Sequence, residues 1–279
     1  MTGTLYLCAT PIGNLSDMSP RIIETLGMVD LIAAEDTRNS IKLLNHFNID
    51  TPMTSYHEYN KIDKAKVLIG KLKAGQNIAL ITDAGTPAIS DPGEVMVVMC
   101  HEEHIPVTSL PGPAALIVAL TLSGLPTRRF CFEAFLPSEK KERRRILDDI
   151  KDESRTIIMY EAPHHLVKTL KLLYETLGNR KITLCRELTK KFESIMPMTL
   201  EDAIAYYNDN EPRGEYVLVI EGKSFKEQIE ERQQTFAEMS IEDHMKMYED
   251  KGIDRKEAMK LVAKDRGVSK RDIYNALLE

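Results

Sequence analysis

The stretch that decides the fold is residues 77–93, which read Asn77-Ile-Ala-Leu-Ile-Thr82 followed by Asp83-Ala-Gly-Thr-Pro-Ala-Ile-Ser-Asp-Pro-Gly93. The first part is a short apolar run, which is typical of a strand buried on both faces of a sheet. Glycine and proline directly after it indicate a tight loop, and Asp91-Pro92 is a favourable start for a helix over 95–100. This stretch therefore predicts a strand, a loop and a helix in succession.

The same order of strand, loop and helix recurs on both sides of this stretch. Further apolar runs, typical of strands, lie at 4–9, 29–34 and 105–110. Helical spacing of apolar residues follows at 20–26, 40–47, 62–72 and 114–122, and Ser19-Pro20 predicts the N-cap and first residue of the earliest helix. This alternation predicts the α/β fold class, with a mainly parallel sheet and helices on both faces.

A second α/β unit and a helical tail are predicted after Ser123-Gly-Leu-Pro126, the best candidate for a domain boundary. Its strands are expected at 130–135, 156–160, 181–186 and 216–220, and its helices at 138–150 and 163–177. From about residue 224 only charged helical patterns remain. We therefore predict an N-terminal α/β domain over 1–122, a C-terminal α/β domain over 123–224 and a small helix-turn-helix-like segment over 225–279.

Composition excludes several classes of protein. The 279 residues include 37 lysines and arginines against 43 acidic residues, a net charge of −6, which excludes a protein that coats nucleic acid by bulk charge but allows a local basic surface. The four cysteines form no C-x-x-C pair, and Cys100-His101-x-x-His104 lacks a fourth ligand, so neither a disulfide scaffold nor a metal site is expected. With no apolar run of roughly 18 residues and no visible secretory signal, we expect a cytoplasmic protein.

Four loops that follow predicted strands are candidates for a ligand site, because open α/β sheets bind ligands beyond the carboxyl ends of their strands. These loops cover 11–14, 35–38, 83–93 and 111–113. Each by itself could be an ordinary turn, whereas four that converge indicate a site. The sequence contains neither G-x-x-x-x-G-K-[ST] nor G-x-G-x-x-G, which argues against ATPases, kinases and standard dinucleotide enzymes. Loops poor in lysine and arginine would suit a neutral or zwitterionic adenosyl ligand.

Six motifs in these regions resemble a known family. They are Thr10-Pro-Ile-Gly-Asn-Leu15, Ala34-Glu-Asp-Thr-Arg38, Asp83-Ala-Gly-Thr-Pro87, Ser90-Asp-Pro-Gly93, Pro111-Gly-Pro113 and Arg186-Glu-Leu-Thr-Lys190. Together they are similar to the bacterial 16S rRNA ribose-2'-O-methyltransferases, which belong to the tetrapyrrole-methylase-like class III AdoMet methyltransferases. The resemblance implies two α/β domains with S-adenosyl-L-methionine (AdoMet) in the cleft between them, and usually a homodimer. It implies methylation of a decoding-centre cytidine, 1402 in standard numbering, in 16S rRNA within the assembled small ribosomal subunit.

The resemblance also implies roles for individual residues. The predicted cofactor-binding residues are Pro11, Ile12, Gly13, Asp83, Gly85, Thr86, Pro87, Ser90, Ala114, Ala115, Tyr160 and Glu161. A general base that removes the hydroxyl proton would be Glu35, Asp36 or Glu187. Each of these carboxylates could instead form a salt bridge, for example Asp36 with Arg38 or Glu187 with Arg186. One departure is His165, where the family often has arginine, so the charge at that position depends on pH here.

Three basic clusters lie at 140–145, 180–191 and 255–271 and could contact phosphates, although a solvated helix face is the usual explanation of such runs. The predicted RNA-binding residues are Asn14, Arg38, Arg143, Arg144, Arg186, Lys190, Lys270 and Arg271. The last cluster predicts two helices, the first ended by Gly267 and the second capped by Ser269. This tail could equally be a dimerisation or packing extension.

Two other functions compete with rRNA methylation. A small-molecule tetrapyrrole methyltransferase on the same fold would need neither three basic clusters nor a helix-turn-helix tail. A non-catalytic RNA-binding assembly factor would bind RNA independently of AdoMet and transfer no methyl group. The sequence favours the rRNA methyltransferase.

Overall fold

A computed structural model describes residues 2–278, without the side chain of Arg232, and the chain divides into two compact units. The first unit extends to Lys151 and continues over 156–221, and the second comprises 152–155 together with the residues from Gly222 onward. Within the described residues, the helices are too short or too polar to cross a bilayer. The further division of the first unit into domains over 1–122 and 123–224 stays a prediction.

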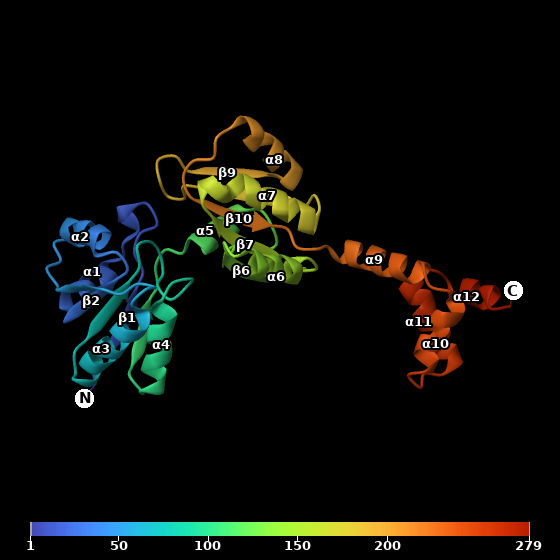
Figure 1. The fold of residues 1–279 in the computed structure, drawn as a ribbon, viewed down its shortest axis with the longest axis horizontal. Helices are drawn as coiled ribbons and strands as arrows, with labels where there is room; N and C mark the ends of the chain where they lie inside the picture. Colours follow the sequence, from blue (N-terminus) through green and yellow to red (C-terminus); the bar gives the residue numbers. More distant parts are fainter. Residues whose placement is uncertain (1, 279) are drawn as a thin grey trace. The chain divides into compact units, whose positions relative to one another are not determined.

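The first sheet is fully parallel, as its apolar strands predict. Its strands are β1 (Leu5–Cys8), β2 (Leu31–Ala34), β3 (Met53–Ser55), β4 (Ile78–Ile81) and β5 (Val107–Leu110), in the order β3-β2-β4-β1-β5. The helices are α1 (Pro20–Met28), α2 (Thr37–His46), α3 (Lys61–Lys73) and α4 (Gly93–Glu102). Buried residues of α1 and α2 pack on one face and those of α3 and α4 on the other (Figure 1). The predicted parallel sheet with helices on both faces is therefore confirmed.

The second sheet is mixed, in the order β6-β7-β10-β8-β9. Only β6 (Phe130–Phe135) and β7 (Thr156–Glu161) pair in parallel, and β8 (Lys181–Arg186), β9 (Ser194–Thr199) and β10 (Tyr216–Ile220) are antiparallel to their neighbours. One face packs on α6 (Lys140–Ile150), α7 (Pro163–Leu177) and α8 (Leu200–Asp209). Neither β9 nor α8 was predicted from the sequence. β9 contains Pro197 and lies at the edge of the sheet, where proline is tolerated.

Helix α5 (Ala115–Leu122) covers the other face of the second sheet, although it follows the last strand of the first. Its buried residues Leu116, Ala119 and Leu120 pack with Cys185 and Val217. The chain thus leaves the first sheet in the loop at 111–113, before α5 begins. This crossover places the start of α5 between the strand ends of the two sheets.

The second unit consists of α9 (Phe225–Ala237), α10 (Ile241–Glu249), α11 (Arg255–Arg266) and α12 (Lys270–Ala276) around a small core. Gly267 ends α11 with φ +68°, in the left-handed region that glycine adopts most easily. Ser269 caps α12 by accepting a hydrogen bond from the backbone N–H of Asp272. Both helix boundaries predicted for the tail are therefore confirmed.

Candidate functional site

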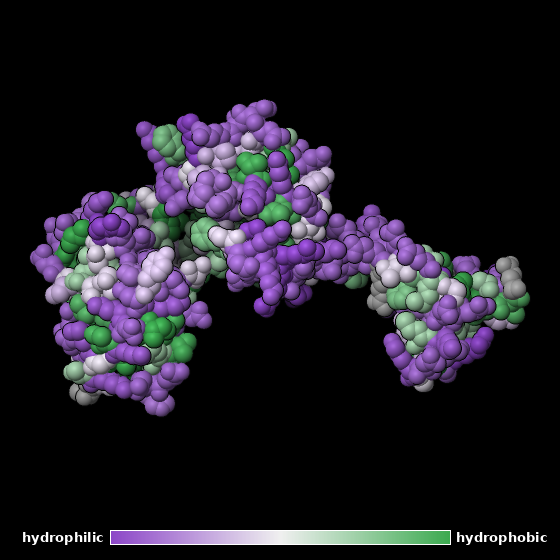
Figure 2. Space-filling view, in the orientation of Figure 1, coloured by the Kyte–Doolittle hydropathy of each residue, from purple (hydrophilic) through white to green (hydrophobic). Residues whose placement is uncertain are grey.

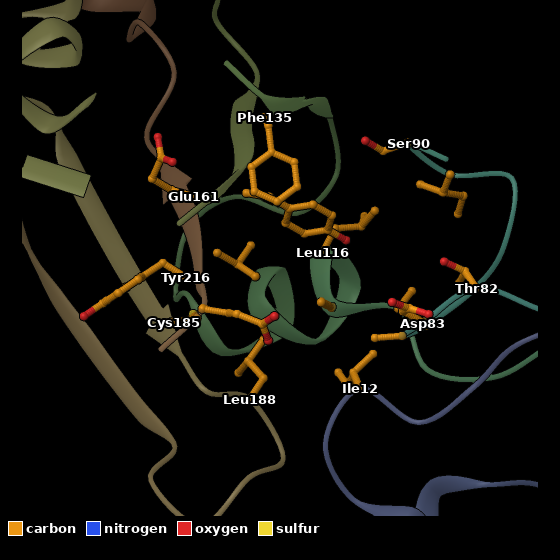
Figure 3. A pocket seen from close by; sticks show the side chains of 18 of the residues that line it. Ile12, Thr82, Asp83, Ser90, Leu116, Phe135, Glu161, Cys185, Leu188 and Tyr216 are labelled. Carbon is orange, nitrogen blue, oxygen red and sulfur yellow. The ribbon is translucent and has the colours of Figure 1, made fainter. Parts of the chain in front are cut away.

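A cavity of about 590 Å³ lies at the strand ends of the first sheet and beside the second sheet, entirely within the first unit. This volume is that of a typical small-molecule site. Figure 3 shows Thr82, Asp83 and Ser90 on one side of the cavity and Glu161, Cys185 and Tyr216 on the opposite side. Ile12, Leu116 and Phe135 supply apolar surface. The cavity can therefore enclose a ligand that is partly apolar.

Backbone hydrogen bonds hold the predicted loops together. Thr10 and Gly85 exchange two of them, with N···O distances of 2.9 Å and 3.0 Å, and Thr86 Oγ1 donates to Pro113 O at 2.9 Å. Gly85 has φ +87°, a conformation that strains any other residue. Ile12, Glu35 and residues of 83–91 line the cavity, so three of the four loops converge there; the fourth, 111–113, contributes no lining residue but is bonded to Thr86 and leads directly into Ala114, which does.

Unusual backbone conformations concentrate around the cavity. Ala88 and Ser90 in the third loop have φ +67° and +65°, and Glu187 and Thr189 after β8 have φ +51° and +63°. Non-glycine residues adopt these angles at a cost of about 1–3 kcal/mol each, and they occur most often at functional sites. Ser90 and Glu187 line the cavity, so the strain lies where a ligand would be held.

Carboxylates outnumber cations around the cavity. Its lining includes Glu35, Asp83, Asp91, Glu161, Glu187 and Glu215, and Lys190 is the one lysine or arginine among the described residues that line it. Burial raises the pKa of Asp83, with a further contribution from the charge of Glu35, and burial also raises the pKa of Asp91. A cation or a group with several hydrogen-bond donors would stabilise these carboxylates.

The three predicted base candidates have different surroundings. Glu35 Oε2 accepts from Thr82 Oγ1 at 2.6 Å and from the backbone N–H of Asp83 at 3.4 Å. Asp36 caps α2 and forms the expected salt bridge with Arg38 at 2.7 Å, whose guanidinium lowers the pKa of Asp36 to about 2. Asp36 lies outside the large cavity, in a second cavity that shares Glu35 with the first.

Glu187 also carries a salt bridge, but with a different partner from the one expected. Its carboxylate contacts Lys190 Nζ at 3.1 Å rather than Arg186, and it accepts from the backbone N–H of Glu215 at 2.9 Å. Although burial opposes the shift, the Glu215 N–H and the Lys190 ammonium lower the pKa of Glu187. The Arg186 side chain donates instead to Phe192 O at 3.5 Å. The interpretation of Glu187 with Arg186 as a pair is therefore corrected to Glu187 with Lys190.

Nine of the twelve predicted cofactor-binding residues line the cavity. These are Ile12, Asp83, Gly85, Thr86, Ser90, Ala114, Ala115, Tyr160 and Glu161. Pro11, Gly13 and Pro87 belong to the same loops but are not part of the lining. Gly13 has another role, because a Cβ on it would lie 2.4 Å from Lys190 Cγ and 2.9 Å from Leu188 O. This glycine allows the first loop to approach the segment after β8.

The lining that the sequence did not single out comes mostly from the second sheet. It includes Phe135, Cys185, Leu188 and 215–217, together with Leu116 of α5. Phe135 and Tyr160 are in contact, with ring centroids 5.5 Å apart. Phe135 and Cys185 lie in apolar strands with no loop motif, so no local signal distinguishes them from core, whereas Leu188 lies within the Arg186–Lys190 motif. Burial raises the pKa of the Cys185 thiol to about 12, which keeps it neutral.

The predicted RNA-binding residues come from several elements of both units. Lys190 lines the large cavity and Arg38 the second one. Arg143 and Arg144 lie on α6, whose surface is strongly hydrophilic in Figure 2, and Arg144 contacts Asp148 at 3.8 Å. Asn14 caps the short helix η1 (Leu15–Asp17), while Lys270 and Arg271 begin α12 in the second unit. Arg180, expected in the second basic cluster, is buried and donates to Lys151 O at 3.0 Å, so it adds no surface charge.

Comparison with known proteins identifies the architecture. The tetrapyrrole (corrin/porphyrin) methylases match residues 4–204. A protein of Synechocystis sp. named ribosomal RNA small subunit methyltransferase I is 49% identical over 99% of this chain and 98% of its own. One of the same name from Halalkalibacterium halodurans is 49% identical over 98% of this chain and 94% of its own. The crystal structure of diphthine synthase has a TM-score of 0.62 at 14% identity, covering 80% of this chain and 91% of that one. This likeness confirms the predicted fold.

Proposed function

Because the chain belongs to the tetrapyrrole methylase family and is a methyltransferase, we propose that it uses AdoMet to methylate the ribose 2'-hydroxyl of a decoding-centre cytidine, 1402 in standard 16S rRNA numbering. The substrate class is supported by the names of relatives that match along nearly the whole chain. The observation that carries the proposal is the acidic cavity at the strand ends, whose loops contain the motifs quoted above.

The cavity suits AdoMet by its chemistry. AdoMet carries a sulfonium and an ammonium group, and the carboxylates of Asp83 and Glu35 favour cations nearby. The adenine ring needs apolar surface, which Ile12, Leu116 and Phe135 provide. The small residues Ala114 and Ala115 leave backbone groups accessible at the start of α5. No phosphate has to be held, in agreement with the lack of a phosphate-binding motif.

When bound, AdoMet supplies a methyl group that its sulfonium already activates for transfer. The protein must align a ribose oxygen with that group, and orientation of this kind lowers barriers by as much as about 7–11 kcal/mol. Residues of both sheets line the cavity, so its two sides together can orient a ligand. The strained backbone at Ser90 and Glu187 indicates that the shape is held before a ligand arrives.

Glu35 is the best placed of the three base candidates. Asp36 is bound by Arg38 and its pKa of about 2 makes it a weak base. Glu187 is ion-paired with Lys190, which also contacts Glu215, and its pKa is lowered too. Glu35 contacts only neutral donors among the hydrogen bonds described for it, Thr82 Oγ1 and the N–H of Asp83. We therefore assign proton removal to Glu35, which lines both cavities.

The remaining assignments concern RNA and assembly. The basic residues of α6 and α12, with Arg38 and Lys190, are proposed to contact rRNA phosphates in the assembled small subunit. The working form is proposed to be a homodimer, as the resemblance implies. Light scattering of the purified protein measures its mass directly, and a monomer at micromolar concentration would contradict the dimer.

The experiment that tests the function combines the purified protein, labelled AdoMet and small ribosomal subunits from a strain that lacks this gene. We expect one methyl group per subunit, recovered as 2'-O-methylcytidine after digestion and mass spectrometry. Label on a base, or transfer to a tetrapyrrole but not to the subunit, would contradict the proposal. RNA binding without any transfer would instead identify a non-catalytic assembly factor.

A further inference from the structure

We propose that the second cavity is a nucleobase subsite in which the base attached to the reacting ribose stacks on Tyr59, an inference that rests on the proposed function. This cavity has a volume of about 410 Å³. Its walls are residues 35–38, which follow β2, together with Ser55 at the end of β3 and residues 57–59 of the segment after β3. None of Ser55, His57, Glu58 or Tyr59 was singled out by the sequence.

The two cavities meet at Glu35, which lines both. The hydrogen bond from the backbone N–H of Asp36 to Asp83 Oδ1, at 3.2 Å, ties the wall of the second cavity to the first. In a nucleoside whose base occupies the second cavity, the ribose is joined to that base by a single glycosidic bond and therefore lies directly beside the cavity. That ribose would lie on the Glu35 side, where the proposed proton removal takes place.

The segment after β3 is held in place by its neighbours. Tyr56 is buried, and its hydroxyl donates to Pro92 O at 2.8 Å. Asn60 Oδ1 accepts from the backbone N–H of His57 at 2.9 Å, and Glu58 contacts Lys61 at 2.5 Å. Between these anchors the side chain of Tyr59 is 98% exposed, at the rim of the cavity. An exposed aromatic ring beside a cavity, on a backbone segment held by its neighbours, offers the surface that base stacking uses.

The charges of the second cavity disfavour a phosphate as its ligand. Glu35, Asp36 and Glu58 line it, and Arg38 is already paired with Asp36 at 2.7 Å. The Asn60 amide, oriented by its bond to the His57 backbone, lies 3.3 Å from His57 Nε2 and engages that ring nitrogen. Carboxylates accept hydrogen bonds from the exocyclic amino groups of bases. The ligand that fits is therefore a base with an amino group, such as cytosine.

The test compares methylation of small subunits by four proteins: the wild type, Tyr59→Phe, Tyr59→Leu and Tyr206→Leu. Tyr206 is the matched control, because it is exposed on α8 and lines neither cavity. Losing a base stack costs about 1–3 kcal/mol, so we expect kcat/KM to fall about 5- to 150-fold in Tyr59→Leu, mainly through KM. Tyr59→Phe and Tyr206→Leu should stay within about twofold of the wild type, because stacking is retained or not involved.

A measurement of AdoMet affinity by calorimetry separates this subsite from the cofactor cavity. Unchanged affinity in Tyr59→Leu is expected, and a parallel loss would show that Tyr59 acts on the cofactor side and overturn the subsite. Equal KM values for Tyr59→Leu and the wild type would overturn the subsite while leaving the proposed function intact. A wild-type protein that transfers no methyl group to the subunit would overturn both.

Discussion

The two sheets of the first unit contribute to the same cavity in different ways. In the parallel first sheet, the carboxyl ends of all strands lie at the same edge. The loops that follow them carry glycine, proline and carboxylate residues. In the mixed second sheet, strands run in both directions and the cavity is lined by side chains such as Phe135, Cys185 and Leu188. The comparison shows that the first sheet contributes mainly loops shaped by glycine and proline, whereas the second contributes side chains at strand ends, both apolar and charged.

The largest expected effect tests whether the general base lies on the first-sheet side of the cavity. Replacing Glu35 with Gln on the first-sheet side should lower kcat about 10²–10⁴-fold, because a general base typically contributes that much. The matched change Glu187→Gln on the second-sheet side should have a much smaller effect, since Glu187 is already ion-paired with Lys190. Steady-state methylation of small subunits measures both, and a larger loss in Glu187→Gln would reverse the comparison.

The next effect concerns the cores beneath the two sheets. Leu68 of α3 and Leu170 of α7 are both fully buried, in the first-sheet and second-sheet cores respectively. Replacing either with Ala should lower the free energy of unfolding by about 2–5 kcal/mol, through lost burial and the cavity left behind. Urea denaturation followed by circular dichroism at 222 nm measures this loss. A change below about 1 kcal/mol in one variant would show that its core is not closely packed.

A smaller effect is expected from the glycines with positive φ. Gly85→Ala should destabilise the protein by about 1–2 kcal/mol, because φ is +87° and the new Cβ would lie 3.3 Å from Ile12 Cγ2. Gly214, with φ +78°, is the counterpart before β10, where a Cβ would meet the side chain of Glu187 at 2.5 Å. We expect AdoMet affinity, measured by calorimetry, to fall more in Gly85→Ala. Equal losses would show that both sides shape the cofactor site alike.

The smallest effect is a dependence of stability on pH from Glu187 and Lys190. Because the pKa of Glu187 is lowered in the folded protein, its contribution is complete above the ordinary value of 4.5 and is lost as pH falls through the lowered value. Lys190→Met should remove the part of this contribution that comes from the ion pair, about 1 kcal/mol or less, and leave stability at lower pH nearly unchanged. Thermal unfolding between pH 3 and pH 7 measures it. A difference between variant and wild type that grows toward low pH would contradict the assignment.

Much of the candidate site could be predicted from local patterns. Residues such as Asp83, Gly85 and Ser90 stand directly after an apolar run, and parallel strands bring such loops to one edge. The segment after β3 was not predicted as part of a site. β3 has only three residues, and the sequence offers no signal that distinguishes Tyr56 from Tyr59. In the structure Tyr56 is buried and Tyr59 almost fully exposed. Only packing distinguishes the two tyrosines.

The sequence by itself determined the α/β class, the parallel first sheet, most helices and the loops that form one side of the cavity. These features follow from periodicity, helix caps and glycine or proline positions, which act over a few residues. The tertiary structure alone decided that α5 packs on the second sheet, that Lys190 contacts Glu215, and that Glu35 lies between two cavities. The reason is physical, since these relations join residues far apart in the chain and depend on how complete layers pack.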